Sequence, residues 1–212
     1  MSNQQEQLAE LKEIRNLMER SSRFLSLSGL AGLVIGTFAI IGILLAYNYL
    51  DIPLTATGYY HLLMKEGGQL HLENLSFLFA DMALVLALSL LAGSMLAIRK
   101  AKKLGLPIWD ITARRLLINM GIPLLAGGIY CMILVYHGQL AQLAPATLIF
   151  YGLALLNASK YTIDDIRYLG ILEVITGLVA AIFIDYGLLL WAFGFGFLHI
   201  IYGIVIYIKY EK

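Results

Sequence analysis

The 212-residue chain has few charges. Asp, Glu, Lys and Arg make up 14% of it, whereas soluble domains have about 25%. Hydrophobic residues make up 60%, above the usual share of about 45–50%. Together the two deviations indicate an integral membrane protein, whose first partner is the lipid bilayer. The net charge of +1 provides no overall positive field, so we expect no nucleic-acid partner.

Cysteine is also scarce in this chain. Cys131 is the only one, and it lies within an apolar segment. A lone cysteine cannot form a disulfide within the chain, and it lacks the companions that a zinc or iron–sulfur site needs. The histidines and carboxylates between residues 48 and 75 match no metal-ligand spacing, and we interpret them as solvated loop residues. We therefore expect no metal site and no cofactor.

Catalytic signatures are also missing. The sequence has no P-loop, no GxSxG, no HExxH, no dinucleotide-binding fingerprint and no paired-carboxylate pattern. The expectation is therefore a protein that is not an enzyme.

Long apolar segments dominate what remains. Crossing the hydrocarbon core takes about 20 helical residues, with a range of about 17–25. Six segments meet this length, at approximately residues 24–47, 76–98, 116–136, 140–157, 168–184 and 187–208. The sequence thus predicts an all-α polytopic membrane protein, with six transmembrane helices in a domain over residues 24–212 and an outer loop over residues 48–75.

Residues 1–23 are polar, with apolar side chains at helical spacing. This pattern predicts an amphipathic helix, on the cytoplasmic side, leading into the first membrane helix. A partner-binding role for this helix stays open.

The placement of Lys and Arg predicts how the chain is threaded. Of the 15 basic residues, only Lys65 falls on the outer side of this arrangement. Because cytoplasmic segments carry the excess of Lys and Arg, both termini are expected to be cytoplasmic. Helix-start signals fit the same threading: Asp110 precedes the third segment, and TIDD (Thr162 to Asp165) precedes the fifth.

Glycine pairs recur at a spacing of seven residues. They are Gly29–Gly36, Gly121–Gly128 and Gly170–Gly177, each in the first helix of a pair. Seven residues span two helical turns, so each pair lies on one face, and small residues on one face let membrane helices approach closely. The pattern predicts three tandem helical hairpins.

One carboxylate interrupts this pattern. Glu173 lies within GILEVITG, on the same predicted face as the flanking glycines, and His199 lies between Gly196 and Gly203 in the last segment. If the last two helices reverse near residue 186, Glu173 and His199 lie at the same depth on facing small-residue stripes. Ionisable residues inside a membrane are costly, so the pair is the leading candidate site. Its role is either a structural clasp or a proton-responsive switch or relay.

Other polar residues are secondary candidates. Asn119 and Asn157 are alternative partners for Glu173, and Asp81 either reaches the outer boundary or has a buried role. A basic cluster could bind anionic lipid headgroups, although its part in setting the topology already accounts for it; its members are Arg99, Lys100, Lys102, Lys103, Arg114 and Arg115.

The final unit, LGILEVITGLVAAIFIDYGLLLWAFGFGFLHIIYGIVIYIKY, resembles a hairpin of a family of bacterial six-helix membrane proteins with short repeats, the HdeD-type acid-resistance family. A glycine-rich first helix, a tight outer turn and a second helix that ends in basic residues carry the resemblance. It is best over residues 168–210, weaker over 116–160 and poor over the first hairpin. It implies a bacterial inner membrane and a stress-related or acid-related role, and it supplies no catalytic residues.

Three functions follow as expectations. The first is a non-enzymatic membrane protein of stress-related or structural type that responds to pH through Glu173 and His199. The second is a small proton-coupled transporter or channel. The third is a membrane-bound regulator that recruits a cytoplasmic partner. A homo-oligomer is compatible with each of them.

Overall fold

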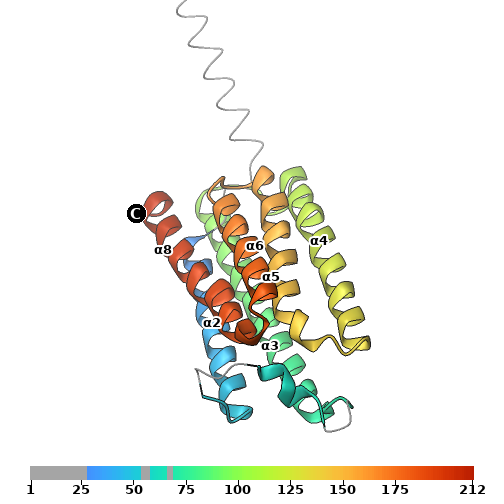
Figure 1. The fold of residues 1–212 in the computed structure, drawn as a ribbon. Coiled ribbons are helices and arrows are strands. Elements are labelled where there is room, and N and C mark those ends of the chain that lie inside the picture. Colours follow the sequence, from blue (N-terminus) through green and yellow to red (C-terminus); the bar gives the residue numbers. More distant parts are fainter. Residues whose placement is uncertain (1–27, 54–57, 66–68) are drawn as a thin grey trace, which may run out of the picture.

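The computed structural model describes residues 28–53, 58–65 and 69–212. In this part of the chain the structure is helical, apart from one antiparallel bridge between Met64 and Leu70. The helices stand side by side in a bundle (Figure 1). The all-α prediction is thus confirmed, whereas the amphipathic helix predicted in residues 1–23 lies outside the described residues.

Six helical runs make up the bundle. Short 3₁₀ turns connect several of them, and the last run contains a π-helical segment, η5. In chain order the runs are α2 (Gly29–Tyr49), α3 (Leu72–Lys103), α4 (Ile111–Tyr136), α5 (Leu143–Ala158), α6 (Ile166–Ile182) and the series α7 (Gly187–Trp191), η5 (Ala192–Leu198) and α8 (His199–Tyr210). The 3₁₀ turns are η1 (Tyr59–Leu63), η2 (Leu140–Gln142), η3 (Ser159–Tyr161) and η4 (Ile184–Tyr186).

Five stretches among the described residues are long and apolar enough to cross a membrane. They are Gly29–Tyr49, Leu72–Lys103, Ile111–Tyr136, Leu140–Tyr161 and Ile184–Tyr210. The fifth predicted segment corresponds to α6, which has 17 residues and is shorter than these. The helices therefore match the six predicted segments in order, and five of them have the length and composition of a span.

The outer surface of the bundle is apolar. Leu86 and Leu125, on α3 and α4, are 60% and 70% exposed, and Ile182 of α6 is 73% exposed. A water-soluble monomer rarely exposes apolar surface on this scale. Side chains of this kind suit contact with hydrocarbon chains, as expected of an integral membrane protein.

Glycines bring α2 against the last helical run. A Cβ built on Gly32 would lie 2.9 Å from Cα of Gly203, and one built on Gly203 would lie 2.6 Å from the backbone nitrogen of Leu33. Likewise, a Cβ built on Gly36 would lie 2.6 Å from the carbonyl oxygen of Gly196. The two backbones are in direct contact, which only small residues permit. Figure 1 shows α2 and α8 side by side.

A second glycine contact joins α5 and α6. A Cβ on Gly152 would lie 2.7 Å from the carbonyl oxygen of Gly170, and one on Gly177 would lie 2.9 Å from the backbone nitrogen of Ile149. The prediction that the glycine stripes of the last two helices face each other is therefore wrong. The stripe of α6 faces α5, and the stripe of the last run faces α2.

The third glycine pair does not mark a helix contact. No atom lies within 4 Å of a Cβ built on Gly121 or on Gly128, whereas Gly127 packs closely on the ring of Phe150. The seven-residue spacing therefore identifies packing faces on α2 and α6 but not on α4. The three-hairpin repeat stays a prediction.

The described part of the predicted outer loop covers one end of the bundle. The Gly58 amide donates to the carbonyl of Asp185 (2.9 Å), and the Tyr60 hydroxyl donates to the Asp185 carboxylate (3.0 Å). Tyr59 and Leu63 are buried, while His61 is exposed. The loop is therefore not only a solvated connection, because it packs on the turn that precedes α7.

We expect substitutions of the contact glycines to destabilise the bundle. Gly203→Ala would force the backbones of α2 and α8 apart, and overpacking of this kind typically costs about 1–3 kcal/mol. The added Cβ of Gly121→Ala would have no atom within 4 Å. This substitution should leave the stability unchanged or raise it, because alanine favours a helix by up to about 1 kcal/mol over glycine. Thermal unfolding in detergent micelles, followed by circular dichroism, measures both. Equal melting temperatures for the two variants would contradict the described helix contacts.

Candidate functional site

Glu173 is fully buried. It lies in the middle of α6 and is 0% exposed, and neither carboxyl oxygen has a hydrogen-bond partner in the described part of the chain. Gly194, in η5, leaves room for it, since a Cβ at that position would lie 2.6 Å from Oε2 of Glu173. The carboxyl group therefore occupies a space that a side chain at residue 194 would fill.

His199 lies with its side chain close to that carboxyl group. It begins α8 and is 3% exposed, and its Nδ1 lies 3.3 Å from Oε1 of Glu173. Nδ1 also lies 3.1 Å from the carbonyl oxygen of Gly194, and Nε2 lies 2.8 Å from the hydroxyl of Tyr151. A carbonyl oxygen only accepts hydrogen bonds, so Nδ1 carries a hydrogen and donates it to Gly194. The contact with Glu173 is thus electrostatic and close, but it is not an aligned hydrogen bond.

The backbone of η5 is part of this arrangement. In a π-helix the hydrogen bonds run between residues five apart, and such segments occur frequently at functional sites. The ring of His199 bonds back to residue 194, which is also five positions earlier. The sequence AFGFGFL alternates glycine and phenylalanine here, and glycine weakens the preference for an α-helix. This run is a local sequence signal for η5. The sequence analysis did not predict a π-helix here.

Aromatic rings enclose the imidazole. Tyr151 lies on α5, beside the contact glycine Gly152, and its ring centroid is 4.9 Å from that of Phe195 and 5.4 Å from that of His199. The hydroxyl of Tyr202, one turn beyond His199, is buried and has no hydrogen-bond partner among the described residues. The surroundings of the pair are therefore apolar rings with few polar atoms.

This geometry is suited to holding a proton. An ionised carboxylate in an apolar interior is very unfavourable without a partner, and such groups are instead neutralised or paired. The imidazole of His199 is the partner within reach of Glu173. Between them, one proton makes the pair electrically neutral, either as acid and imidazole or as carboxylate and imidazolium.

Asn119 and Asn157 do not join this pair. Asn157 donates through Nδ2 to the backbone carbonyl of Asn119 (3.2 Å), and Asn119 donates to the carbonyl of Arg115 (2.8 Å). Lys160 donates to Oδ1 of Asn157 (3.3 Å). These residues connect α4 with α5, so the alternative in which one of them bonds to Glu173 is wrong.

Asp81 lies elsewhere. It is half-buried on α3, and a Cβ built on Gly42 of α2 would lie 3.2 Å from its Oδ2. The carboxyl group therefore packs against α2, and its reach to the outer boundary stays a prediction. No described hydrogen bond or ion pair joins it to the candidate pair.

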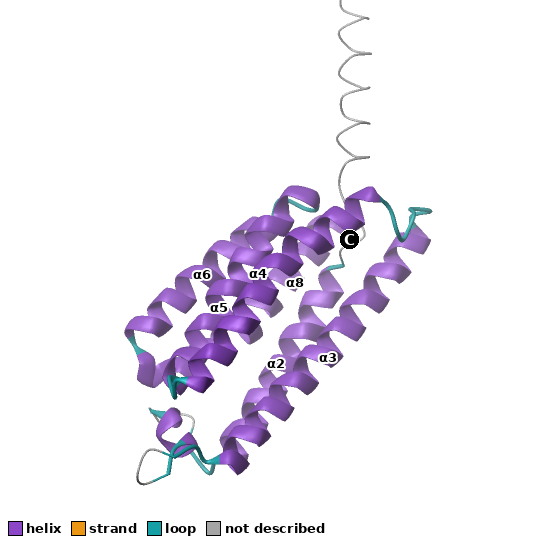
Figure 2. Ribbon diagram, turned by 90° about the vertical axis from the view of Figure 1, so that its right-hand side faces the viewer, coloured by secondary structure: helices purple, strands orange, loops and turns teal. Residues whose placement is uncertain are grey.

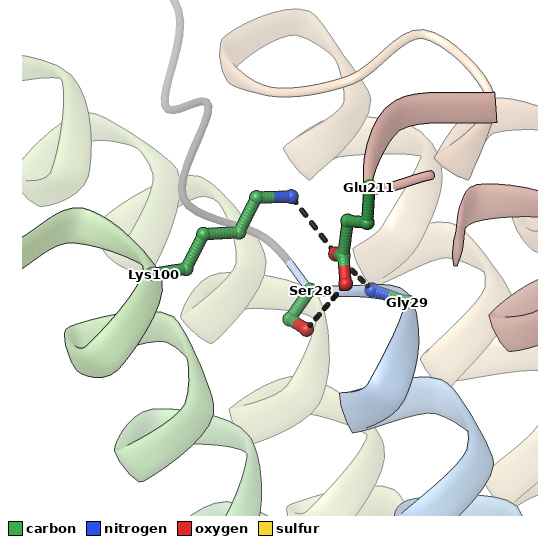
Figure 3. A network of polar contacts seen from close by, with 4 residues as sticks. All are labelled: Ser28, Gly29, Lys100 and Glu211. Atoms are coloured by element: carbon green, nitrogen blue, oxygen red, sulfur yellow. Dashed lines mark hydrogen bonds and ion pairs between the residues drawn. The ribbon is translucent and has the colours of Figure 1, made fainter. Parts of the chain in front are cut away.

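Glu211 is a polar anchor that the sequence analysis missed. Its carboxylate accepts hydrogen bonds from the Gly29 amide (2.8 Å), from Nζ of Lys100 (2.9 Å) and from the hydroxyl of Ser28 (3.3 Å), as Figure 3 shows. A negative group at the start of a helix is favourable, because the amides there lack partners within the helix. The network joins the chain's C-terminal end to the start of α2 and the end of α3.

Burial works to raise the pKa of Glu211, but the hydrogen bonds from Lys100 and the Gly29 amide outweigh it and hold that pKa below its usual value. Lys100 was predicted as a lipid-headgroup ligand, and in the structure it binds Glu211. The other members of the basic cluster are exposed, and lipid binding by them stays a prediction; they are Arg99, Lys102, Lys103, Arg114 and Arg115.

The two predicted helix starts have different outcomes. Asp110 accepts a hydrogen bond from the Ala113 amide (2.6 Å) and caps α4, as predicted. Asp165 precedes α6 but makes no side-chain cap bond. It instead accepts hydrogen bonds from Lys209 (2.9 Å) and Tyr210 (2.6 Å), so that it joins the start of α6 to the end of α8.

We expect Glu173 and His199 to be energetically coupled. Removing either partner leaves the other buried without compensation, so the losses caused by Glu173→Gln and His199→Gln should not add. A double-mutant cycle on stability in detergent should give a coupling energy of about 1–3 kcal/mol, within the range for residues in contact. Asn157→Ala combined with Glu173→Gln serves as a control and should be additive. Additive losses for the first cycle would contradict the pairing.

Glu211 should make stability depend on pH. Because folding lowers its pKa, its contribution is present above the ordinary glutamate pKa of about 4.3 and is lost as the pH falls through the lowered value. The melting temperature of the wild type should therefore exceed that of Glu211→Gln at pH 7, and the difference should shrink below about pH 4. Lys212→Gln, at the next residue, should not reproduce this trend. A difference that does not vary with pH would count against the network.

The chain was also compared with known proteins. No known family, curated protein or solved structure matches it. The resemblance to the HdeD-type family therefore stays a prediction.

Proposed function

We propose that this chain is a non-enzymatic membrane protein that responds to acid through a proton shared by Glu173 and His199. The observation that carries the proposal is the complete burial of the Glu173 carboxyl group, with Nδ1 of the His199 imidazole 3.3 Å from its Oε1. A group that served stability alone would more simply be apolar, because replacing a buried ion pair by hydrophobic residues is often neutral or stabilising.

The proposed setting is an inner membrane, crossed six times, with both termini cytoplasmic. The described basic residues support it by their distribution. The ends of α3 and α8 and the start of α2 meet at the Glu211 network, and the start of α6 meets Lys209 at the same end. Lys65 lies between η1 and the start of α3, and therefore at the opposite end of α3 from Lys100. Such an asymmetry is what the positive-inside rule requires.

Acid acts on the pair through its net charge. With one shared proton the pair is neutral, whereas a second proton leaves a net positive charge in an apolar site. The titratable side chains nearby are Tyr151 on α5 and Tyr202 on α8, and neither is a carboxylate that could compensate. The added charge should therefore weaken the packing of α6 against η5, and the bistable element would be the π-helical turn between Gly194 and His199.

Trp191 can report this change. Its ring lies 4.8 Å from Phe195, and Phe195 stacks on His199 at 6.1 Å. In the background Trp109→Phe, Trp191 is the one tryptophan left. We expect its fluorescence in nanodiscs to change in a single transition as the pH is lowered, and we expect both Glu173→Gln and His199→Gln to abolish that transition.

Asp81→Asn is the matched control. It also replaces a membrane-embedded carboxyl group, but one that packs against Gly42 and not against the pair. The transition should persist in this variant. A transition that survives unchanged in Glu173→Gln and His199→Gln, or that is absent from the parent, would refute the proposal.

Proton-coupled transport is the second candidate. It is favoured by a cavity that reaches His199 from the end of the bundle where Ser28 lies. It is disfavoured by the nearly complete apolar character of that cavity's lining, because a proton path needs a chain of polar groups or water. The response to acid is thus the better supported of the two functions.

A further inference from the structure

A cavity of about 180 Å³ lies in the half of the bundle that contains the Glu211 network. Helices α2, α3, α4, α5, α6 and α8 all contribute to its wall. Small residues form the side made by α2 and α3, and among them are Ala31, Gly32, Gly93 and Ala97. Tyr151, His199 and Ser28 are also part of its lining. Figure 2 shows how α2 and α3 run next to each other in the bundle.

The cavity is partly open to its surroundings, and its volume of about 180 Å³ is larger than a small packing void. Protein interiors are close-packed and contain few voids larger than a water molecule. An engineered apolar cavity of about 150 Å³ stays free of water and takes up benzene or xenon. The present cavity exceeds that size and has a similar lining, so a molecule of at least one ring fits it.

The chemistry of the lining determines what kind of molecule is accepted. The wall carries no Asp, Glu, Lys or Arg. Two of its polar groups already have partners, since the Tyr151 hydroxyl bonds to His199 and the Ser28 hydroxyl bonds to Glu211. The Tyr202 hydroxyl, which has no partner among the described residues, is the one further polar contact that the wall is shown to offer. A charged or strongly hydrated molecule would lose its water shell without compensation. The occupant must therefore be neutral and mainly apolar.

Gly93 supports this interpretation. A Cβ built on Gly93 would meet only Cδ1 of Ile35, at 3.5 Å, which is an ordinary contact. By contrast, a Cβ on Gly32 would strike the backbone of α8. Gly93 is thus not required by a close helix approach, and glycine weakens a helix relative to alanine. The absence of a side chain at Gly93 leaves space in the cavity.

We propose that this cavity binds a neutral apolar molecule, either an aromatic ring dissolved in the bilayer or the end of a single hydrocarbon chain. Both present the same chemistry to the wall, and they differ in shape and source. The proposal does not depend on the response to acid, because it needs only the volume and the apolar lining of the cavity.

The test is ligand-induced thermal stabilisation of the full chain in detergent micelles. Benzene serves as the ring and dodecanol as the chain. A ligand that binds only the folded state raises the melting temperature, and saturation should give a rise of about 5 °C. Ala97→Leu fills the cavity and should remove the rise, whereas Ala87→Leu makes the same change at an exposed position of α3 and should keep it.

A rise with benzene alone identifies a free ring compound as the ligand type, and a rise with dodecanol alone identifies a chain; either supports the site if Ala97→Leu abolishes it. Equal shifts in the wild type and in Ala97→Leu, or no rise with either compound, would overturn the proposal. Gly93→Ala, whose Cβ would make only an ordinary contact with Ile35, is a second variant if Ala97→Leu does not fold, and it should reduce the rise.

Discussion

The structure around the last two helical runs depends on how one buried carboxyl group is accommodated. Glu173 is fully buried, and among the described residues the imidazole of His199 lies 3.3 Å from its carboxyl group. That requirement accounts for several neighbouring features. Gly194 leaves space for Oε2, and its carbonyl fixes Nδ1 of the imidazole. Tyr151 bonds to the other ring nitrogen, so the orientation of the ring is determined at both nitrogens.

Two glycine contacts hold these groups in place. Glu173 lies between Gly170 and Gly177, the residues through which α6 touches α5, and His199 lies between Gly196 and Gly203, the residues through which the last run touches α2. The pair is therefore located where two backbone-to-backbone contacts meet. In a bilayer the hydrophobic effect does not drive helices together, so close packing of this kind supplies much of their association. The pair is thus close to the glycine contacts of both α6 and the last helical run.

The structural features that could be predicted from the sequence are those with a local or periodic signal. Apolar length predicted the order of the helices, and Asp110 was recognisable as a cap because its partner is three residues away. Counting residues from the turn near residue 186 placed Glu173 and His199 at one depth, and the structure brings them together, although the glycine stripes beside them face other helices. Glycine spacing indicates that a helix face can pack closely, but it does not indicate which helix packs on that face. On α4 the spacing marks no helix contact.

The features that escaped prediction depend on distant parts of the chain. Glu211 bonds to Gly29, 182 positions away, and no local pattern signals that contact. The cavity exists only because six helices leave a gap between them. The π-helical turn had a local signal in AFGFGFL, but its use, which is to direct His199 toward Gly194, emerges only from the packed bundle.

The most direct test of the account is a distance measurement in a lipid bilayer. Solid-state NMR of a sample labelled with ¹³C at the Glu173 carboxyl and ¹⁵N in the imidazole of His199 measures the dipolar coupling between the two groups. With Nδ1 located 3.3 Å from Oε1, the account predicts a clear coupling from the carboxyl carbon to Nδ1 and a weaker one to Nε2. A carboxyl signal with no coupling to either nitrogen would show that the pair does not form, and the central claim would be contradicted.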